Sequence, residues 1–176
     1  GTYGTASMVS VGRISVAIRF ARLEDIPNLV EIGHAYHTEG RFKAYDYDPD
    51  KLAANLKGLI EDTTGARCFF VADDKQQKPY GALLGHVDSY FFSSSPIAQL
   101  IFFWVHPNHR GGPAAIKLMT AFKKWAENRK VLEIAVSVTS AIRIDRADTF
   151  FKKLGFQLTG GNYSYMVRNR EVAHEH

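Results

Sequence analysis

The stretch from Leu100 to Met119 predicts a strand, a tight basic turn and a helix in immediate succession. Large apolar residues fill positions 100–105 and stop at His106-Pro107, and a basic turn containing two glycines follows at 108–112. From Pro113 onward, apolar residues recur with helical spacing: Ala115, Leu118, Met119, Phe122, Trp125 and Ala126. A helix N-terminus that follows glycines presents unpaired backbone N–H groups and the positive end of a dipole. The turn is therefore predicted to cradle a phosphate group.

The composition is that of a globular protein with one hydrophobic core. The chain has 176 residues, which suits a single domain. We assign that domain to residues 8–176 and interpret residues 1–7, which are small and polar and precede Met8, as a cloning remnant. No apolar stretch reaches the length of a membrane span, so we expect a cytoplasmic protein that does not enter a membrane. The single cysteine, Cys68, lies in an apolar run and is expected to be a buried small hydrophobe.

The charge of the chain bears on its partners. A net charge of +4 permits attraction to anions, including phosphorylated cofactors and nucleic acid. The basic residues are dispersed, and those on the predicted helix after Pro113 lie off its apolar stripe. We therefore interpret them as a solvated surface, and binding to nucleic acid is the less favoured alternative.

Alternation and helical spacing predict the remaining elements. Strands are expected over 14–20, 66–72, 80–92, 97–105 and 131–139, and a closing hairpin over 156–158 and 162–168. Helices are expected over 24–36, from Pro49 to about residue 63, over 113–129, and over a segment that contains 147–154 and stops at Gly155. The order is β-α-α-β-β-β-α-β-α-β-β. This order predicts an α+β fold, with a mixed, mostly antiparallel sheet of about seven strands flanked by about four helices.

Two motifs in this order resemble the GNAT family of N-acetyltransferases. The family's cofactor signature, Arg/Gln-x-x-Gly-x-Gly/Ala after a strand, is similar to Arg110–Ala115, although Pro113 replaces the first glycine. A second signature resembles Ala147–Phe156, although Phe151 replaces the usual tyrosine. Proline has no N–H to give to a phosphate but suits the first turn of a helix. In relatives the tyrosine is thought to protonate the departing CoA thiolate, which phenylalanine cannot do.

The resemblance implies a GNAT fold and an acetyl-CoA-dependent enzyme. It implies that the thioester carbonyl is held by backbone N–H groups at the end of the strand before the turn. It also implies that the pyrophosphate lies on the amides of the turn and that Phe151 lies beside the cofactor. The cofactor-binding residues expected on this basis are Phe103, Trp104, Val105, Arg110, Gly111, Gly112, Ala114, Ala115 and Phe151.

The chemistry expected is direct transfer of an acetyl group to a primary amine in a ternary complex. Such a transfer needs a group that takes a proton from the amine. The candidates are His86 and Asp88, which share one face of a strand, and His106 at the end of the neighbouring strand. The fourth is Ser140, near the mouth of the cleft that the resemblance implies between the strands over 97–105 and 131–139.

The partners expected follow from the same resemblance. We expect a small-molecule or peptide amine as the acceptor. No metal is expected, because the spacing of His34, His37 and Glu39 suits no metal site. A homodimer is an open alternative to a monomer. A catalytically degenerate GNAT domain that serves as a CoA-binding or regulatory module is the alternative function.

Overall fold

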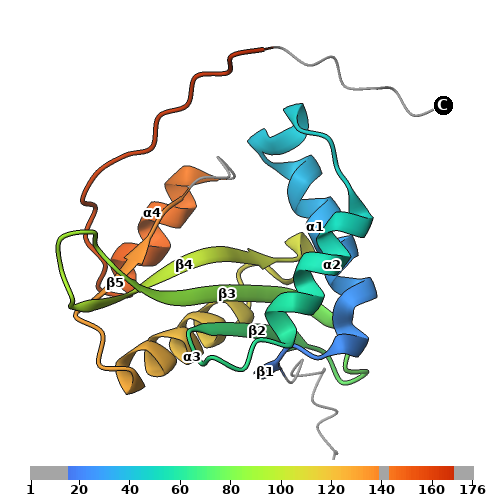
Figure 1. The fold of residues 1–176 in the computed structure, drawn as a ribbon. Helices are drawn as coiled ribbons and strands as arrows, with labels where there is room; N and C mark the ends of the chain where they lie inside the picture. Colours follow the sequence, from blue (N-terminus) through green and yellow to red (C-terminus); the bar gives the residue numbers. More distant parts are fainter. Residues whose placement is uncertain (1–15, 139–142, 169–176) are drawn as a thin grey trace, which may run out of the picture.

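The computed structural model describes residues 16–138 and 143–168 as a five-stranded sheet with helices on both faces (Figure 1). The strands lie in the order β1-β2-β3-β4-β5, and only β4 and β5 are parallel. They are β1 (Ala17–Phe20), β2 (Arg67–Asp73), β3 (Pro79–Ser89), β4 (Pro96–Val105) and β5 (Glu133–Val136). The helices are α1 (Ile26–Glu39), α2 (Pro49–Ile60), α3 (Ala114–Asn128) and α4 (Ile144–Lys153). Short 3-10 turns lie at Leu23–Asp25, Arg41–Ala44 and Pro107–His109.

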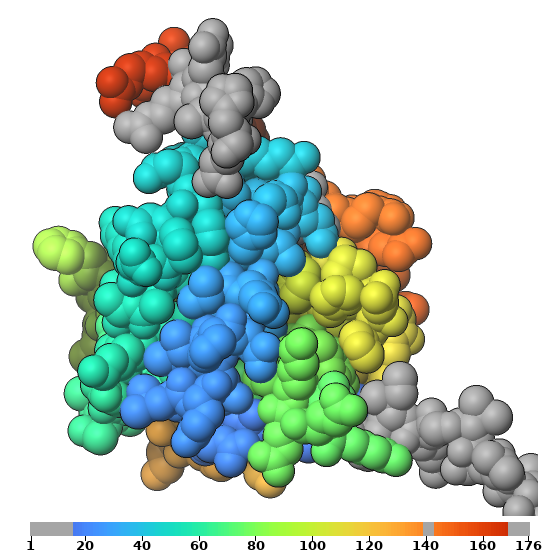
Figure 2. All heavy atoms as spheres, turned by 90° about the vertical axis from the view of Figure 1, so that its right-hand side faces the viewer, coloured from blue at the N-terminus to red at the C-terminus, as the bar shows by residue number. Residues whose placement is uncertain are grey.

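The alternation of side chains along the central strands divides the core into two layers. Phe69 and Val71 of β2 pack with α1 and α2, whereas Cys68 and Phe70 pack with α3. Figure 2 views the molecule with α1 and α2, coloured blue to cyan, towards the reader. Because neighbouring strand residues point to opposite faces, the continuous apolar runs of β2, β3 and β4 supply both layers.

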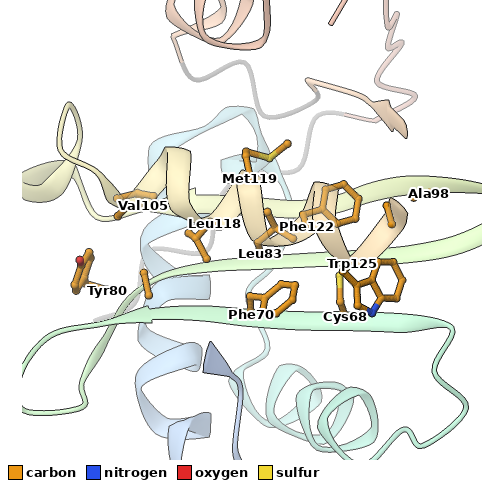
Figure 3. Close-up of a cluster of buried hydrophobic side chains, with 13 residues drawn as sticks. Cys68, Phe70, Tyr80, Leu83, Ala98, Val105, Leu118, Met119, Phe122 and Trp125 are labelled. Atoms are coloured by element: carbon orange, nitrogen blue, oxygen red, sulfur yellow. The ribbon is translucent and has the colours of Figure 1, made fainter. Parts of the chain in front are cut away.

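Helix α3 supplies the largest buried side chains of the second layer. Leu118, Met119 and Phe122 are fully buried, and Figure 3 shows Leu118 and Phe122 among the side chains between α3 and the sheet. Phe122 lies over Gly85 of β3 so closely that a Cβ added at Gly85 would overlap its ring. The glycine is therefore needed for space, and it fixes the height of α3 above the sheet.

Substituting Gly85 by alanine is expected to destabilise the fold by about 1–3 kcal/mol, because the ring of Phe122 must leave its position. Gly58 in α2 is the matched control, since nothing lies within 4 Å of a Cβ added there. Gly58→Ala is expected to stabilise the helix by up to about 1 kcal/mol. Urea unfolding of both variants measures the difference, and equal stabilities would contradict the packing described.

A buried ion cluster joins β1, β2 and the turn before α1. The guanidinium of Arg19 donates to Asp73 Oδ2 from Nε at 2.6 Å and to both carboxylate oxygens of Asp25 at 2.7 and 2.8 Å. Asp25 also accepts from the backbone N–H of Arg22 at 2.8 Å. Both carboxylates are buried. Burial acts to raise the pKa of Asp25, but the hydrogen bonds from Arg19 and Arg22 outweigh it, and the pKa lies below its ordinary value.

The lowered pKa of Asp25 predicts acid sensitivity. Its stabilisation is complete above the unfolded-state pKa near 3.8 and is lost as the pH falls below that value towards the folded-state pKa. Asp25→Asn is expected to cost about 3 kcal/mol at neutral pH and to flatten the acid limb of the stability curve. Unfolding free energies measured from pH 7 down to acid test this expectation, with the exposed Asp50→Asn as control. An unchanged acid limb in Asp25→Asn would contradict it.

The α+β class, the mixed sheet and the four helices agree with the sequence prediction, but the closing hairpin does not. Within the described residues the sheet has five strands rather than about seven, because residues 156–158 and 162–168 form no strand. The segment from 157 to 168 is exposed throughout and lies apart from the sheet (Figure 1). A segment with alternating apolar residues forms a strand only when it pairs with the edge of another strand, and no described strand pairs with this segment.

Smaller differences concern the ends of elements. β3 ends at Ser89 rather than at residue 92, and β5 spans Glu133–Val136 rather than 131–139. The predicted cloning remnant at 1–7 and the start of the first predicted strand lie outside the described residues. No helix in the described part of the chain is long and apolar enough to cross a membrane.

Candidate active site

The site is organised by the point at which β4 and β5 separate. The two strands pair in parallel from Ile97 with Glu133 to Leu100 with Val136, and the pairing ends there. From Ile101 to Val105, β4 has β3 on one side and no described strand on the other. One edge of the second half of β4 is therefore open.

A β-bulge lies where the separation begins. Leu84 pairs with Phe102 while the next residue, Gly85, pairs with Leu100, so Ile101 is the extra residue in β4. Ile101 and Phe102 consequently turn towards the same face, the one covered by α1 and α2. Bulges re-aim a strand and often lie beside functional sites.

Beyond the bulge, alternate residues of β4 direct their backbone groups to the open edge. The N–H of His106 donates to the carbonyl of Tyr80 at 2.8 Å, and this bond determines which alternate residues of β4 are hydrogen-bonded to β3. In this pattern Trp104 exchanges hydrogen bonds with β3, whereas the N–H groups of Phe103 and Val105 face away from β3. Of the three predicted backbone donors, Phe103 and Val105 are therefore directed to the open edge and Trp104 is not.

The turn after β4 places the N-terminus of α3 at the end of this edge. Gly111 has φ +84°, a left-handed conformation that favours glycine. The amides of Arg110 and Gly112 donate within the turn, to Pro107 O and His109 O, both at 3.3 Å. The first intrahelical bond is donated by Lys117 to Pro113 O, so the amides of Ala114 and Ala115 are free of the helix ladder. Gly111, Ala114 and Ala115 are thus the predicted donors that remain available in this turn.

A small hollow adjoins the same turn. It has a volume of about 120 Å³. Tyr80 stacks on His109 beside it, with ring centroids 4.0 Å apart. The residues that line it are Val16, Tyr80, Asn108, His109, Arg110, Gly112, Pro113 and Ala114.

The side chain of Arg110 ties the turn to α1. Its Nη1 lies 2.5 Å and its Nη2 lies 3.0 Å from the two carboxylate oxygens of Glu39, and its Nε donates to Val105 O at 2.8 Å. The guanidinium is therefore engaged by protein groups, and its contribution to phosphate binding would require it to leave Glu39. The sequence did not indicate Glu39 as the partner of Arg110, because the two residues are 71 positions apart.

Phe151 lies in an aromatic cluster on α4. Its ring contacts Phe150 and Phe156 edge to face, and Phe150 stacks on Phe103 of β4 with centroids 6.0 Å apart. These contacts bring α4 beside the second half of β4, on the face shared with α3. The position that the resemblance assigns to a hydroxyl group is therefore filled by an apolar ring.

Of the predicted catalytic residues that the structure describes, His86 and Asp88 share one face of β3, but His106 is not brought beside them. His86 and Gln99 form a cross-strand pair, with His86 Nε2 2.8 Å from Gln99 Oε1. His106 lies at the other end of the β3–β4 pair, about 20 Å from His86 at the usual rise per strand residue. Asp88 is exposed and accepts from the N–H of Ser89, while Ser140 lies outside the described residues. His106 has a structural role, since its Nδ1 accepts from the N–H of Asn108 at 3.1 Å.

Among the candidates that the structure describes, His86 lines a groove, whereas Asp88 and His106 do not. The groove has a volume of about 640 Å³ and lies between α2 and the sheet. It reaches the bulge at Ile101, where the open edge of β4 begins. The residues that line it are Ala54, Asn55, Gly58, Leu59, Arg67, Leu84, His86 and Ile101. Gln99, which orients His86, was missed in the sequence, although it is the one polar residue in the strand Pro96–Val105.

The aromatic segment that joins α1 to α2 is packed. Tyr36 stacks on Phe42 and contacts Phe102 edge to face, and the hydroxyl of Tyr47 donates to Val30 O at 2.6 Å. His37 Nε2 lies 2.7 Å from the carbonyl oxygen of Tyr45. The described residues contain no group of three or more His, Cys, Asp or Glu side chains placed to hold a metal ion.

The family of the chain is shown by its sequence. Residues 28–156 match the family described as "Acetyltransferase (GNAT) family". The chain belongs to this family of acetyltransferases, as its two motifs had indicated. No curated protein matches the sequence significantly.

Solved structures share the fold at low identity. A transcriptional regulator from Bacillus halodurans C-125 is 21% identical with a TM-score of 0.71, over 86% of this chain and 99% of the other. AAC(6')-Iy in complex with the bisubstrate analog CoA-S-monomethyl-acetylneamine is 18% identical with a TM-score of 0.64, over 87% and 98%. The aminoglycoside antibiotic 6'-N-acetyltransferase AAC(6')-Ih from Acinetobacter baumannii is 19% identical with a TM-score of 0.64, over 89% and 99%.

Cys68 is buried beneath α3, as the sequence predicted, and lies apart from the open edge of β4 (Figure 3). Burial raises the pKa of its thiol to about 12. The thiolate is the reactive form of cysteine, so a thiol held protonated near neutral pH is a poor nucleophile.

The native protein is therefore expected to resist a thiol reagent at pH 8, because its single thiol is both inaccessible and protonated. Absorbance of the released chromophore measures the reaction. The denatured chain should react with one equivalent, which provides the control. Rapid stoichiometric labelling of the folded protein would contradict the burial of Cys68.

Proposed function

We propose that the chain is an acetyl-CoA-dependent N-acetyltransferase that passes the acetyl group directly to a primary amine in a ternary complex. The observation that carries the proposal is the open edge of β4, which ends at the N-terminus of α3. The edge offers the N–H groups of Phe103 and Val105, and the turn offers Gly111, Ala114 and Ala115. An extended amide chain with a pyrophosphate at one end fits this donor set, since the chain can add to a strand edge and the anion to a helix N-terminus.

The cofactor would supply an acetyl group activated as a thioester. The backbone N–H groups of β4 near the bulge would polarise its carbonyl oxygen, and Phe103 and Phe150 would exclude water from the thioester end. Arg110, held by Glu39, would keep the turn in shape and would leave phosphate binding mainly to backbone amides. Pro113 would leave the turn with one backbone N–H donor fewer, and its fixed φ would favour the start of α3.

His86 is the group we propose as general base. In this arrangement its Nε2–H donates to Gln99 Oε1, and Nδ1 keeps the lone pair that takes the proton from the amine. Bound acetyl-CoA would supply an acetyl carbon whose bond to sulfur breaks as the bond to the amine nitrogen forms. Because Phe151 has no proton to give, the sulfur would take its proton from water, and the proton on His86 would return to the hydroxide that remains.

The groove between α2 and the sheet is the proposed acceptor site. It reaches the bulge, so an amine beside His86 would face the end of the open edge. The residues that line it include no carboxylate, and Arg67 on its rim is paired with Asp62 at 2.8 Å. A polycation would need acidic groups there. We therefore propose a small-molecule or peptide amine that carries no further positive charges.

The alternative is a CoA-binding or regulatory module without catalysis. The replacement of the usual tyrosine by Phe151 favours it, and so does a relative of the same fold described as a transcriptional regulator. A protein that binds acetyl-CoA but acetylates no member of a broad panel of amines would support this alternative.

Acetyl-CoA binding is expected at micromolar concentration and should raise the melting temperature, because a ligand that binds only the folded state stabilises it. Calorimetry and thermal shift measure both effects. Absence of heat and of any shift at millimolar acetyl-CoA would overturn the proposal.

The role of His86 is tested by His86→Ala with the best amine of the panel. The expected loss in kcat is about 100-fold at neutral pH, with smaller losses at higher pH, where the amine loses its proton without help. Affinity for acetyl-CoA should not change. His34→Ala is the matched control, since His34 is an exposed histidine of α1 outside the groove. A pH-independent loss, or a loss of cofactor affinity, would contradict the assignment of His86 as base.

A further inference from the structure

A row of polar side chains crosses the sheet beside the groove at α2. β2, β3 and β4 lie side by side (Figure 1), and Arg67 of β2 is the register partner of His86, which in turn is the partner of Gln99 of β4. Register partners project to the same face of a sheet, here the face covered by α1 and α2. Arg67 and His86 both line the groove. A cation, a histidine and an amide therefore follow one another on three neighbouring strands.

The guanidinium of Arg67 is held by one carboxylate and is not saturated by it. Its Nη1 donates to Asp62 Oδ2 at 2.8 Å, which is its one ion pair among the described residues. The other oxygen of Asp62 accepts from the N–H of Thr64 at 2.8 Å, so the carboxylate is itself fixed. The side chain of Arg67 remains 49% exposed. Because a guanidinium has five N–H donors, this contact leaves donors for a second anion.

The rest of the groove is neutral and largely apolar. Asn55 is the other polar residue of its lining, and the remaining lining residues are Ala54, Gly58, Leu59, Leu84 and Ile101. Asp88, two residues after His86, accepts from the N–H of Ser89 and does not line the groove. The volume of about 640 Å³ lies within the range of small-molecule sites. One cation among apolar walls favours a ligand with one anionic group and an apolar remainder.

We propose that the groove binds an α-amino acid with an apolar side chain as the acetyl acceptor, with its carboxylate on Arg67 and its amine facing His86. The inference rests on the proposed function, in which His86 takes a proton from the amine. The carboxylate would use the donors of Arg67 that Asp62 leaves, in a charge-assisted pair. Cross-strand partners have Cβ atoms about 5 Å apart, so the two groups suit an amine and a carboxylate separated by few bonds. The product would be an N-acetylamino acid.

Matched pairs of amino acid and carboxamide test this assignment. L-leucine, L-methionine and L-phenylalanine are each compared with the corresponding amide, using acetyl-CoA and the full chain. In the best pair the carboxylate should raise kcat/KM at least about 10-fold, as expected for a hydrogen bond between charged groups. Chemistry alone favours the amide, because loss of the neighbouring negative charge lowers the pKa of its ammonium. Equal or higher kcat/KM for all three amides would overturn the proposal.

Substitutions of Arg67 test which residue holds the carboxylate. In Arg67→Gln the preference for the free amino acid should disappear, mainly through a higher KM, while kcat/KM for the amide stays unchanged. Arg67→Lys keeps the charge without the planar fork and should retain part of the preference. Lys57→Gln is the matched control, since Lys57 is exposed on α2 and does not line the groove. A full preference in Arg67→Gln, or its loss in Lys57→Gln, would overturn the role of Arg67.

Direct binding separates this inference from the proposed function. Titration of the full chain with the same amino acids, with and without CoA, is followed by calorimetry and should show saturable binding that Arg67→Gln abolishes. Such binding without acetyl transfer would uphold the class of ligand and overturn the proposed reaction. Acetylation of other amines, with neither binding nor acetylation of the amino acids, would overturn the class of ligand and leave the reaction standing. Absence of binding and of all acetylation would overturn both.

Discussion

The early end of the parallel pairing between β4 and β5 is the constraint on which the rest of the site depends. Four residue pairs hold the strands together, and the bulge at Ile101 then turns β4 away. Because alternate residues of a strand direct their backbone groups to opposite edges, the separation leaves the N–H groups of Phe103 and Val105 with no partner strand in the described part of the chain. The same bulge turns Ile101 to the face of α2, where it borders the groove that contains His86. One backbone irregularity thus orients both the proposed donor edge and the proposed acceptor groove.

The two layers of the core keep this geometry in place. Phe122 of α3 rests directly on Gly85, the residue of β3 at which the pairing register with β4 shifts. Helix α3 therefore packs on the bulged region and also carries at its N-terminus the turn that we propose binds phosphate. On the opposite face, Arg110 reaches from this turn to Glu39 at the end of α1. A shift of either helix layer would displace the turn relative to the open edge of β4.

The sequence predicts most of the fold but only part of the site. The features that could be predicted depend on neighbouring residues, whereas the others depend on residues far apart in the sequence. Pro49 after Asp48, and the apolar stripe after Pro113, define α2 and α3 because caps and helical spacing are local signals. The residues that predict the turn over 108–112 are also close together in the sequence. The bulge at Ile101, the contact of Gln99 with His86 and the tie between Arg110 and Glu39 depend on strand register and on residues distant in sequence. Residues 156–158 and 162–168 were predicted to form a hairpin, because alternating apolar residues indicate a strand. The alternation does not indicate which strand edge, if any, will pair with that segment.

The replacement of tyrosine by Phe151 has an unequal effect on the two proton transfers in the proposed reaction. An alkyl ammonium resembling lysine has a pKa near 10.4, so an amine acceptor is almost fully protonated at neutral pH. A thiol has a pKa near 8.5, so a thiolate can leave and exist in water at little cost. The base is therefore the group that the reaction needs, whereas the acid is dispensable. In the proposed reaction a histidine with an orienting partner lies on the amine side and an apolar ring lies on the thiolate side, which is the distribution that these pKa values favour.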